Sequence, residues 1–204
     1  MSDKEFWEDF YSNKKGTLTP SPFAEYVLKE HQLKGSLIEL GCGNGRDSIY
    51  FIKNELEVFG TDQCETTIGR LSDLNLQGGK FEVKDFTDLG ALGKFDNIYS
   101  RFTLHSVSEK QASQTLVWAF DSLTTGGKLC IEVRSIHDEL YGEGEEVERD
   151  AFVTDHYRRF VRIEELTKEL ETLGFNIEYS EESKGFAIYK DEDPAVIRIV
   201  ATKS

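Results

Sequence analysis

The stretch Ile38-Glu39-Leu40-Gly41-Cys42-Gly43-Asn44-Gly45 decides the fold class of this 204-residue chain. Its apolar start predicts a buried strand over residues 36–40, and the alternate glycines predict a tight turn leading into a helix over 46–53. Glycines there let a ligand approach the backbone N–H groups at the start of the helix. The stretch therefore predicts a strand, a ligand-binding turn and a helix in succession.

Short apolar runs and helical stretches continue to alternate after this turn. Strands are predicted over residues 57–62, 80–84, 95–99, 128–134, 175–179 and 196–201, and helices over 65–74, 109–123 and 163–173. This alternation is typical of a mostly parallel sheet with helices on both faces. We therefore predict an α/β fold.

The segments outside this alternation complete a single predicted domain, residues 1–204. Residues 4–12 form an amphipathic, aromatic stretch, and Ser21 can cap a helix that begins at Pro22 and ends near His31. We expect residues 1–34 to form a helical lid, 35–134 the cofactor-binding core, 135–162 an insertion at the substrate site, and 163–204 a closing helix and hairpin. Long connections after the carboxyl end of a strand commonly build the site.

Composition limits the partners and the compartment. The chain carries 38 acidic and 24 basic residues, and its net charge of −14 repels a nucleic acid backbone. Cys42, Cys64 and Cys130 are scattered without a C-x-x-C pair, which argues against a disulfide framework or a zinc site. No apolar run is long enough for a membrane helix, and residues 1–5 do not resemble a signal peptide. We therefore expect a soluble cytoplasmic protein, a monomer or homodimer, without metal, nucleic acid or membrane partners.

Polar residues follow the predicted strands at their carboxyl ends, the edge where open α/β sheets bind ligands. Asp62 ends the second strand, about twenty residues after the glycine turn, and a carboxylate there can accept both ribose hydroxyls. Asp85 follows the third strand and can accept from an adenine amino group, with Phe86 beside it to cover the base. The Gly-x-Gly-x-Gly spacing differs from the Gly-x-Gly-x-x-Gly of dinucleotide enzymes, although a dinucleotide-dependent oxidoreductase stays an alternative.

Three segments resemble the class I S-adenosylmethionine (SAM)-dependent methyltransferases, most closely the small tellurite-resistance-type enzymes. Residues 38–48 resemble motif I of that family, 95–100 its fourth strand, and 123–129 the turn before its fifth strand. The resemblance covers residues 35–134. It implies a Rossmann-like, seven-stranded, mostly parallel sheet with an antiparallel last strand, SAM as methyl donor and S-adenosylhomocysteine as product.

The resemblance also implies which residues contact the cofactor. The three glycines would lie against its methionine part, Asp62 at the ribose, and Asp85 with Phe86 at the adenine. Its carboxylate would pair with Arg46 or with an N-terminal residue such as Tyr11 or Lys14. The full predicted cofactor set is Glu39, Gly41, Gly43, Gly45, Arg46, Asp62, Gln63, Asp85, Phe86, Ser100 and Tyr11.

Histidines at two strand ends are the catalytic candidates. Methyl transfer depends mainly on alignment, which is worth about 7 to 11 kcal/mol, and a base is needed only when the nucleophile must lose a proton. His105, after the fourth strand, is the predicted base, and His137, after the fifth strand, is the second candidate. The alternative is that each histidine only bonds to a loop.

A cationic acceptor pocket is predicted within this acidic chain, because arginine matches phosphate, phosphoramidate and carboxylate groups. The predicted acceptor residues are Arg101, Arg134, Tyr141, His156, Tyr157, Arg158 and Arg159; the alternative is that this segment pairs with Glu143, Glu145, Glu146 and Glu148. We expect methyl transfer to an oxygen or nitrogen of a small anionic metabolite. Residues 135–160 resemble methyltransferases of bacterial surface-polysaccharide gene clusters, including those that form methyl phosphoramidate. A protein methyltransferase and a SAM-binding regulator without turnover are the alternatives.

Overall fold

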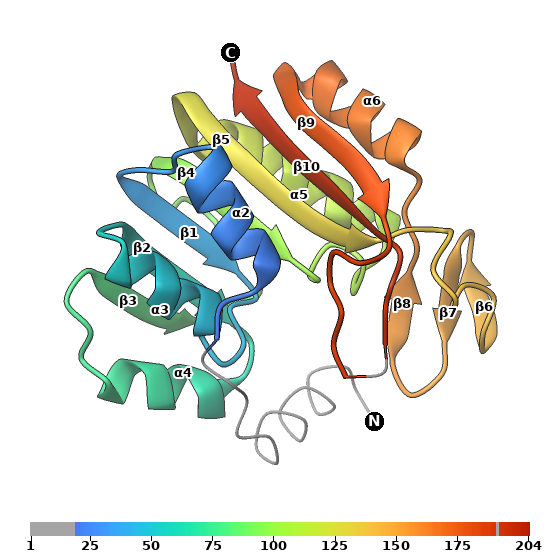
Figure 1. The fold of residues 1–204 in the computed structure, drawn as a ribbon, viewed down its shortest axis with the longest axis horizontal. Coiled ribbons are helices and arrows are strands. Elements are labelled where there is room, and N and C mark those ends of the chain that lie inside the picture. The colour runs from blue at the N-terminus through green and yellow to red at the C-terminus, as the bar shows by residue number, and fades with distance from the viewer. Residues whose placement is uncertain (1–18, 191) are drawn as a thin grey trace.

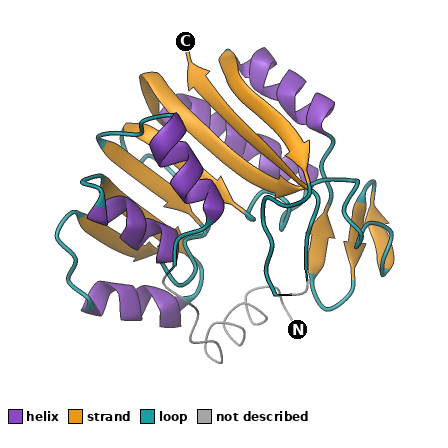
Figure 2. Cartoon of the chain, in the orientation of Figure 1, coloured by secondary structure: helices purple, strands orange, loops and turns teal. Residues whose placement is uncertain are grey.

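The computed structural model describes residues 19–190 and 192–204, and its largest element is a seven-stranded sheet (Figures 1 and 2). The strand order is β3-β2-β1-β4-β5-β10-β9. These strands are β1 (Ser36–Leu40), β2 (Glu57–Asp62), β3 (Gly79–Val83), β4 (Phe95–Arg101), β5 (Leu123–Arg134), β9 (Phe175–Ser183) and β10 (Val196–Lys203). The pairs from β3 to β5 are parallel, whereas β10 is antiparallel to both β5 and β9. The predicted Rossmann-like sheet with an antiparallel last strand is confirmed.

Helices cover both faces of the sheet, as the alternation predicts (Figure 1). They are α2 (Pro22–Glu30), α3 (Arg46–Lys53), α4 (Glu65–Asp73), α5 (Glu109–Ser122) and α6 (Ile163–Leu173). Leu116 of α5 and Leu170 of α6 share a buried cluster with Ile98 of β4. On the opposite face Phe51 of α3 packs against Tyr99. Alternate residues of β4 thus point into two different cores, as its pleat requires.

Helix α2 is a layer of this fold and not part of a lid. Ser21 caps it as predicted, accepting the backbone N–H of Ala24 at 3.1 Å. Phe23 and Val27 are completely buried and belong to the same cluster as Tyr99 of β4. The prediction of a lid is therefore wrong for this helix, because its apolar face is covered by the sheet. The rest of the predicted lid, residues 1–18, lies outside the described residues.

The insertion after β5 contains a small second sheet that the sequence pattern does not predict. Its strands β6 (Glu145–Glu148), β7 (Ala151–Val153) and β8 (Tyr157–Arg159) pair antiparallel. The chain returns from this sheet to the edge of the main one, where Val161 donates its N–H to the carbonyl of Arg134 at 3.0 Å. The small sheet therefore lies next to the carboxyl ends of the central strands (Figure 1).

Four strands are longer than the sequence predicts: β4 and β10 by two residues each, and β5 and β9 by more. β5 begins at Leu123, which pairs with Phe95 of β4. The Thr-Thr-Gly-Gly sequence that follows Leu123 is typical of a turn, but the strand continues through it. β9 continues to Ser183 because it pairs with β10 as far as Val196. None of the helices in the described ranges is long and apolar enough to cross a membrane.

Candidate active site

The glycine turn after β1 is shaped by its backbone conformation. Gly41, Gly43 and Gly45 have φ values of 65°, 52° and 75°, a region where a residue with a side chain is strained. A Cβ atom at Gly41 would also collide with the methyl group of Thr103, which follows β4, and one at Gly45 with Leu71 of α4. Glycine is therefore required both by the turn and by the close approach of neighbouring segments.

Asp62, at the carboxyl end of β2, is tied to the same turn. Its carboxylate accepts the backbone N–H of Gly43 at 2.8 Å and that of Cys64 at 2.9 Å. Asp62 and the neighbouring Gln63 are both half-buried. The structure thus brings these two predicted cofactor residues to the glycine turn, and their contact with a ribose stays a prediction.

A buried polar cluster lies behind the turn and joins α2 to α3. Asp47, in the first turn of α3, accepts the N–H and the hydroxyl of Ser21, both at 2.7 Å, and the hydroxyl of Tyr99 at 3.1 Å. Glu39 of β1 accepts the hydroxyl of Ser48 in α3. Burial and the nearby Asp47 carboxylate raise the pKa of Glu39 well above its usual value. With 4% of its surface exposed, Glu39 serves to hold β1 and α3 together below the turn.

The other predicted cofactor residues have different surroundings. Arg46 begins α3, and its Nε lies 3.8 Å from the carboxylate of Asp47. Asp85 is exposed and accepts the N–H and the hydroxyl of Thr87, at 2.8 and 2.7 Å. Phe86 is 9% exposed, so most of its ring packs in the core on the α5 side of the sheet. Only the small exposed part of Phe86 is available to contact the adenine of the cofactor, and that contact stays a prediction.

Ser100 and Tyr11 are the remaining predicted cofactor residues. Ser100, near the end of β4, is buried, and its hydroxyl lies 2.5 Å from that of Thr103. It therefore shapes the loop that touches Gly41. Tyr11 lies outside the described residues, as does Lys14.

Beyond β4 and β5, two arginines converge on one aromatic ring. Phe102 has a φ of 55° and donates its N–H to the carbonyl of Glu132 at 2.9 Å. The guanidinium carbons of Arg101 and Arg134 lie 4.5 and 5.7 Å from the centre of its ring. The ring of His105 meets the same ring edge-on, with centres 5.2 Å apart. We call Arg101, Phe102, His105 and Arg134 the Phe102 cluster.

Arg101 also belongs to a row of charges that crosses β4, β5 and β10. The strand register pairs Glu132 with Arg101 on one side and with Arg198 on the other. The Glu132 carboxylate, completely buried, lies 2.8 Å from Nε of Arg101 and 2.7 Å from Nε of Arg198. The Arg101 contact is an ion pair without hydrogen-bond alignment. Arg198 also donates to the carbonyl of Phe186 at 2.8 Å.

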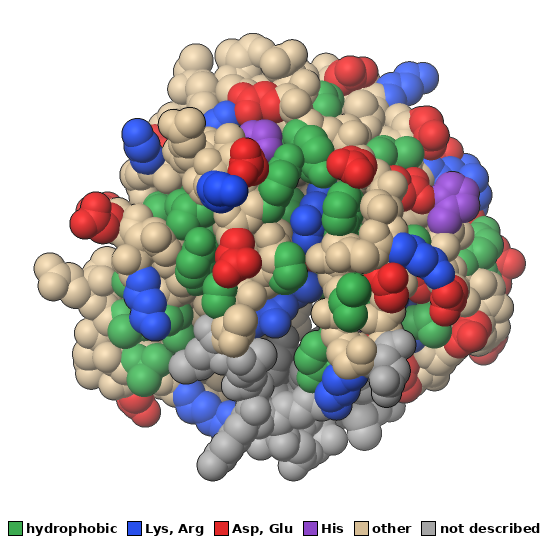
Figure 3. Space-filling view, viewed as in Figure 1, with side chains coloured by type: hydrophobic (Ala, Val, Ile, Leu, Met, Phe, Trp, Pro, Cys, Tyr) green, Lys and Arg blue, Asp and Glu red, His purple; other side chains and the backbone are tan. Residues whose placement is uncertain are grey.

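Arg101 is one end of this row, which continues through Glu132 and Arg198 to Glu181 of β9. The side chain of Arg101 is 17% exposed, and the carboxylates of Glu132 and Asp47 are the acids that act on its charge. Arg134 is paired with Asp138 at 2.8 Å. In the space-filling view of Figure 3, Lys and Arg side chains gather in a furrow near the middle of the face shown. Arg101 is therefore the group of this edge best suited to receive an anion.

His105 is held from several sides. Its Nδ1 accepts the backbone N–H of Arg134 at 3.3 Å, and its carbonyl accepts the N–H of Arg159 at 2.8 Å. Burial, followed by the positive charges of Arg134, Arg159 and Arg158, lowers the pKa of His105 well below its usual value. The imidazole is therefore neutral at pH 7.

The part of the chain that matches a known protein family includes both the glycine turn and the Phe102 cluster. A family model described as a methyltransferase domain matches residues 16–180, most of the chain. The chain belongs to this methyltransferase family. No curated protein sequence matches the chain. The predicted methyltransferase family and the predicted enzyme class are confirmed, and the tellurite-resistance-type subgroup stays a prediction.

Solved structures with this fold include methyltransferases of several kinds. TehB from Haemophilus influenzae is 17% identical, with a TM-score of 0.74 over 97% of this chain and 67% of its own. The 1,6-didemethyltoxoflavin-N1-methyltransferase of Burkholderia thailandensis, with S-adenosylhomocysteine bound, is 18% identical, with a TM-score of 0.72 over 90% and 77%. A SAM-dependent methyltransferase of Clostridium acetobutylicum is 14% identical, with a TM-score of 0.69 over 90% and 91%. At these identities the likeness shows that this methyltransferase shares their fold.

In this methyltransferase the two arginines of β8 have different partners. Arg158 donates to the hydroxyl of Thr154 at 2.8 Å and to the carboxylate of Asp155 at 3.3 Å. Arg159 donates to the carbonyl of Leu104 at 3.0 Å and lines a pocket beside α5 and α6. Arg158 and Arg159 point to opposite faces of the small sheet, as neighbouring residues of a strand do. Arg101 and Arg134 meet at Phe102, and the contact of the two insertion arginines with an acceptor stays a prediction.

Three further predicted acceptor residues bond within the insertion. The hydroxyl of Tyr141 donates to Asp150 at 2.7 Å. His156 is paired with the carboxylate of Asp155 at 2.9 Å. The hydroxyl of Tyr157 lies 3.5 Å from a glutamate of β6, and burial, with that carboxylate, raises its pKa to about 12. In the described structure these side chains support the small sheet.

His137 is separate from the Phe102 cluster. Its Nδ1 bonds to the carboxylate of Glu182 in β9, and its side chain is 70% exposed. Glu182 pairs in register with Ile197, whose side chain belongs to the core on the α6 face. No contact within the described part of the chain joins His137 to His105. The structure therefore does not bring the two predicted catalytic histidines together.

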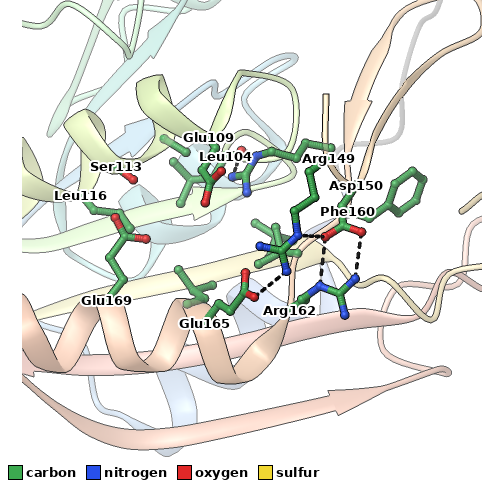
Figure 4. A pocket seen from close by; sticks show the side chains of 15 residues that line it. Leu104, Glu109, Ser113, Leu116, Arg149, Asp150, Phe160, Arg162, Glu165 and Glu169 are labelled. Carbon is green, nitrogen blue, oxygen red and sulfur yellow. Dashed lines mark hydrogen bonds and ion pairs between the residues drawn. The ribbon is translucent and has the colours of Figure 1, made fainter. Parts of the chain in front are cut away.

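The pocket beside α5 and α6 is lined by paired charges (Figure 4). Arg149 is 2.7 Å from the carboxylate of Glu165, and Arg162 is 2.9 Å from that of Asp150. Within residues 19–190 and 192–204, no three His, Cys, Asp or Glu side chains gather as a metal site would require. Both Arg149 and Arg162 are thus paired with carboxylates of the same pocket.

Sequence reasoning missed the residues that join strands at this edge. Glu132 and Arg198 lie inside apolar strands. Phe102 lies between Arg101, a predicted acceptor residue, and His105, the predicted base. A charge within a strand predicted to be buried was the available signal, because such charges are almost always paired. The partner could not be named without the register of β10.

Proposed function

We propose that this methyltransferase binds SAM at the glycine turn and transfers its methyl group to an oxygen or nitrogen of a small anionic metabolite in the cytoplasm. When bound, SAM supplies an electrophilic methyl group on a sulfonium sulfur. The single observation that carries the acceptor side is the convergence of Arg134 and the 17% exposed Arg101 on the ring of Phe102. An anion is the ligand that a guanidinium group favours.

The glycine turn fits the cofactor. Gly41, Gly43 and Gly45 leave the backbone open to a ligand at the start of α3, and the Asp62 carboxylate is fixed beside them by Gly43. Two of the structural neighbours support this assignment. The Burkholderia enzyme holds S-adenosylhomocysteine, and the glycopeptide N-methyltransferase MtfA was solved with sinefungin.

The acceptor would lie against the Phe102 cluster. The planar guanidinium of Arg101 would bind the anionic group with its terminal nitrogens, and the Phe102 ring would form a wall beside it. Thr103, in the same loop, touches Gly41, so the acceptor would sit next to the cofactor turn. Alignment of this kind is the main contribution that such an enzyme makes to the rate.

The proposal includes a subgroup and an acceptor source. The resemblance of residues 38–48 supports the tellurite-resistance-type subgroup. The resemblance of residues 135–160 supports an acceptor from bacterial surface-polysaccharide synthesis. Phosphorylated and carboxylated sugars are therefore the first compounds to test.

The test separates the two binding sites. Calorimetry with SAM and S-adenosylhomocysteine comes first, followed by transfer of labelled methyl groups to a panel of phosphorylated, carboxylated and neutral sugars. Arg101→Met should raise the acceptor KM about tenfold or more, because a charged hydrogen bond is lost, and leave affinity for S-adenosylhomocysteine within about twofold. Arg149→Met, which removes a 63% exposed arginine, is the matched control. Methyl transfer to neutral sugars or peptides alone would contradict the proposal.

A further inference from the structure

We propose that the acceptor atom is an oxygen already ionised at neutral pH, in a carboxylate or a phosphate group, and that His105 holds this group as a neutral hydrogen-bond donor through Nε2–H. The inference rests on the proposed function and narrows its acceptor to an oxyanion. It also replaces the role of general base predicted for His105.

The position of the proton on His105 follows from its contacts. The backbone N–H of Arg134 donates to Nδ1, so that nitrogen presents its lone pair. A neutral imidazole carries one proton, and it must then be on Nε2. The lone pair that a general base would use is therefore occupied by the backbone of β5. What His105 can offer a ligand is a donor.

The groups around His105 keep the ring neutral. Arg134 faces it from β5, Arg158 and Arg159 from β8, and His156 from the loop before β8. The Phe102 ring covers one edge. The positive charges of the three arginines disfavour a second proton on the ring and favour an anion beside it. The same surroundings that stop His105 from accepting a proton thus create a site for an oxyanion.

The described cluster contains no other base. The carboxylates of Glu132 and Asp138 are the nearest acids along β5 and its end, and each is paired with an arginine. An alcohol or an ammonium group would have to release a proton in the step, and no described group of this cluster is placed to take it. A neutral amine needs no base, but it has no negative charge for the arginines around His105 to bind.

An oxyanion needs no base. Its oxygen supplies the electron pair of the new C–O bond, the pair of the broken C–S bond stays on sulfur, and no proton moves. The product is a methyl ester with one negative charge fewer than the acceptor.

The test is NMR of the full chain with ¹⁵N-labelled histidine, in the presence of S-adenosylhomocysteine. His105→Gln assigns the signal. We expect a neutral ring protonated on Nε2 from pH 8 down to pH 5.5, and a saturable shift of that signal on adding inorganic phosphate or acetate. Arg101→Met should raise the half-saturating anion concentration about tenfold or more, and Arg149→Met should leave it unchanged.

The two anions distinguish a phosphate from a carboxylate acceptor, and a response to either supports the oxyanion. A proton on Nδ1, a titration near pH 6.5, or no response to both anions would overturn the inference. Failure of the proposed function would be visible separately, as an absence of S-adenosylhomocysteine binding in the calorimetry of the same sample.

Discussion

The two halves of the carboxyl edge of the sheet are built in different ways. At the ends of β1 and β2, the decisive contacts involve the backbone: glycines with positive φ, and the N–H of Gly43 bonded to Asp62. At the ends of β4, β5 and β10, the contacts join charged side chains from separate strands. The first half depends on the shape of one turn, and the second on charge neutralisation across the sheet. Variants should therefore damage the two halves by different mechanisms.

The largest effect is expected from Glu132→Gln. It leaves two arginines beside an uncharged side chain, and breaking a buried ion pair in this way costs about 3 to 5 kcal/mol in the free energy of unfolding. Glu181→Gln is the matched control, since Glu181 is next to Arg198 in the same row but exposed, and should cost less than about 1 kcal/mol. Urea unfolding measures both. Equal costs would show that the row does not organise this half of the edge.

A smaller loss of stability should come from Gly41→Ala. This variant tests two reasons why the turn needs glycine, the positive φ and the close approach of Thr103. Alanine at Gly90, with a similar φ of 61° and open space around it, should cost about 1 to 2 kcal/mol from the backbone alone. At Gly41 the collision with Thr103 should increase the loss to about 2 to 4 kcal/mol. Adding Thr103→Ser, which removes the methyl group, should recover that difference in thermal or urea unfolding. If it recovers nothing, the two segments do not depend on this contact.

Asp62→Ala should reduce ligand affinity and leave the acceptor half intact. Loss of a charged acceptor should weaken binding of S-adenosylhomocysteine about 10- to 100-fold in calorimetry. Asp88→Ala, at an exposed position after β3, is the control and should bind as the unmodified chain does. Undiminished affinity in Asp62→Ala would move the cofactor site away from this turn.

The smallest effect concerns pH and the acceptor half. The pKa of His105 is lower in the folded chain than the value of about 6.5 in the unfolded chain, so below pH 6.5 the unfolded chain binds more protons. The stability contributed by neutral His105 is therefore present above pH 6.5 and is lost as the pH falls. Relative to His105→Gln, the unmodified chain should lose about 1 to 2 kcal/mol between pH 7 and pH 5 in urea unfolding. A constant difference between the two would contradict the neutral imidazole.

The half of the edge at β1 and β2 could be predicted from the sequence, whereas the half at β4, β5 and β10 could not. The glycine turn, Asp62 and the order of strands are visible because their signals lie in consecutive residues or at a regular spacing. Strand β6 was not predictable, because its residues are all exposed and mostly acidic and lack the apolar alternation of a half-buried strand. The partners of Glu132 depend on the register of β10, which lies more than sixty residues further along the chain. Such pairings arise only when the sheet is assembled.

The place of β10 links ligand binding to the integrity of the fold. β10 lies between β5 and β9, and it brings Arg198 to the carboxylate that Arg101 also contacts. Without β10, Arg198 would no longer share the Glu132 carboxylate, and Arg101 would be bound to it alone. The insertion of one strand therefore makes Arg101 more available to an anion. By linkage, an anion held at Arg101 would favour the docked state of β10 and make the edge of the sheet more resistant to local opening.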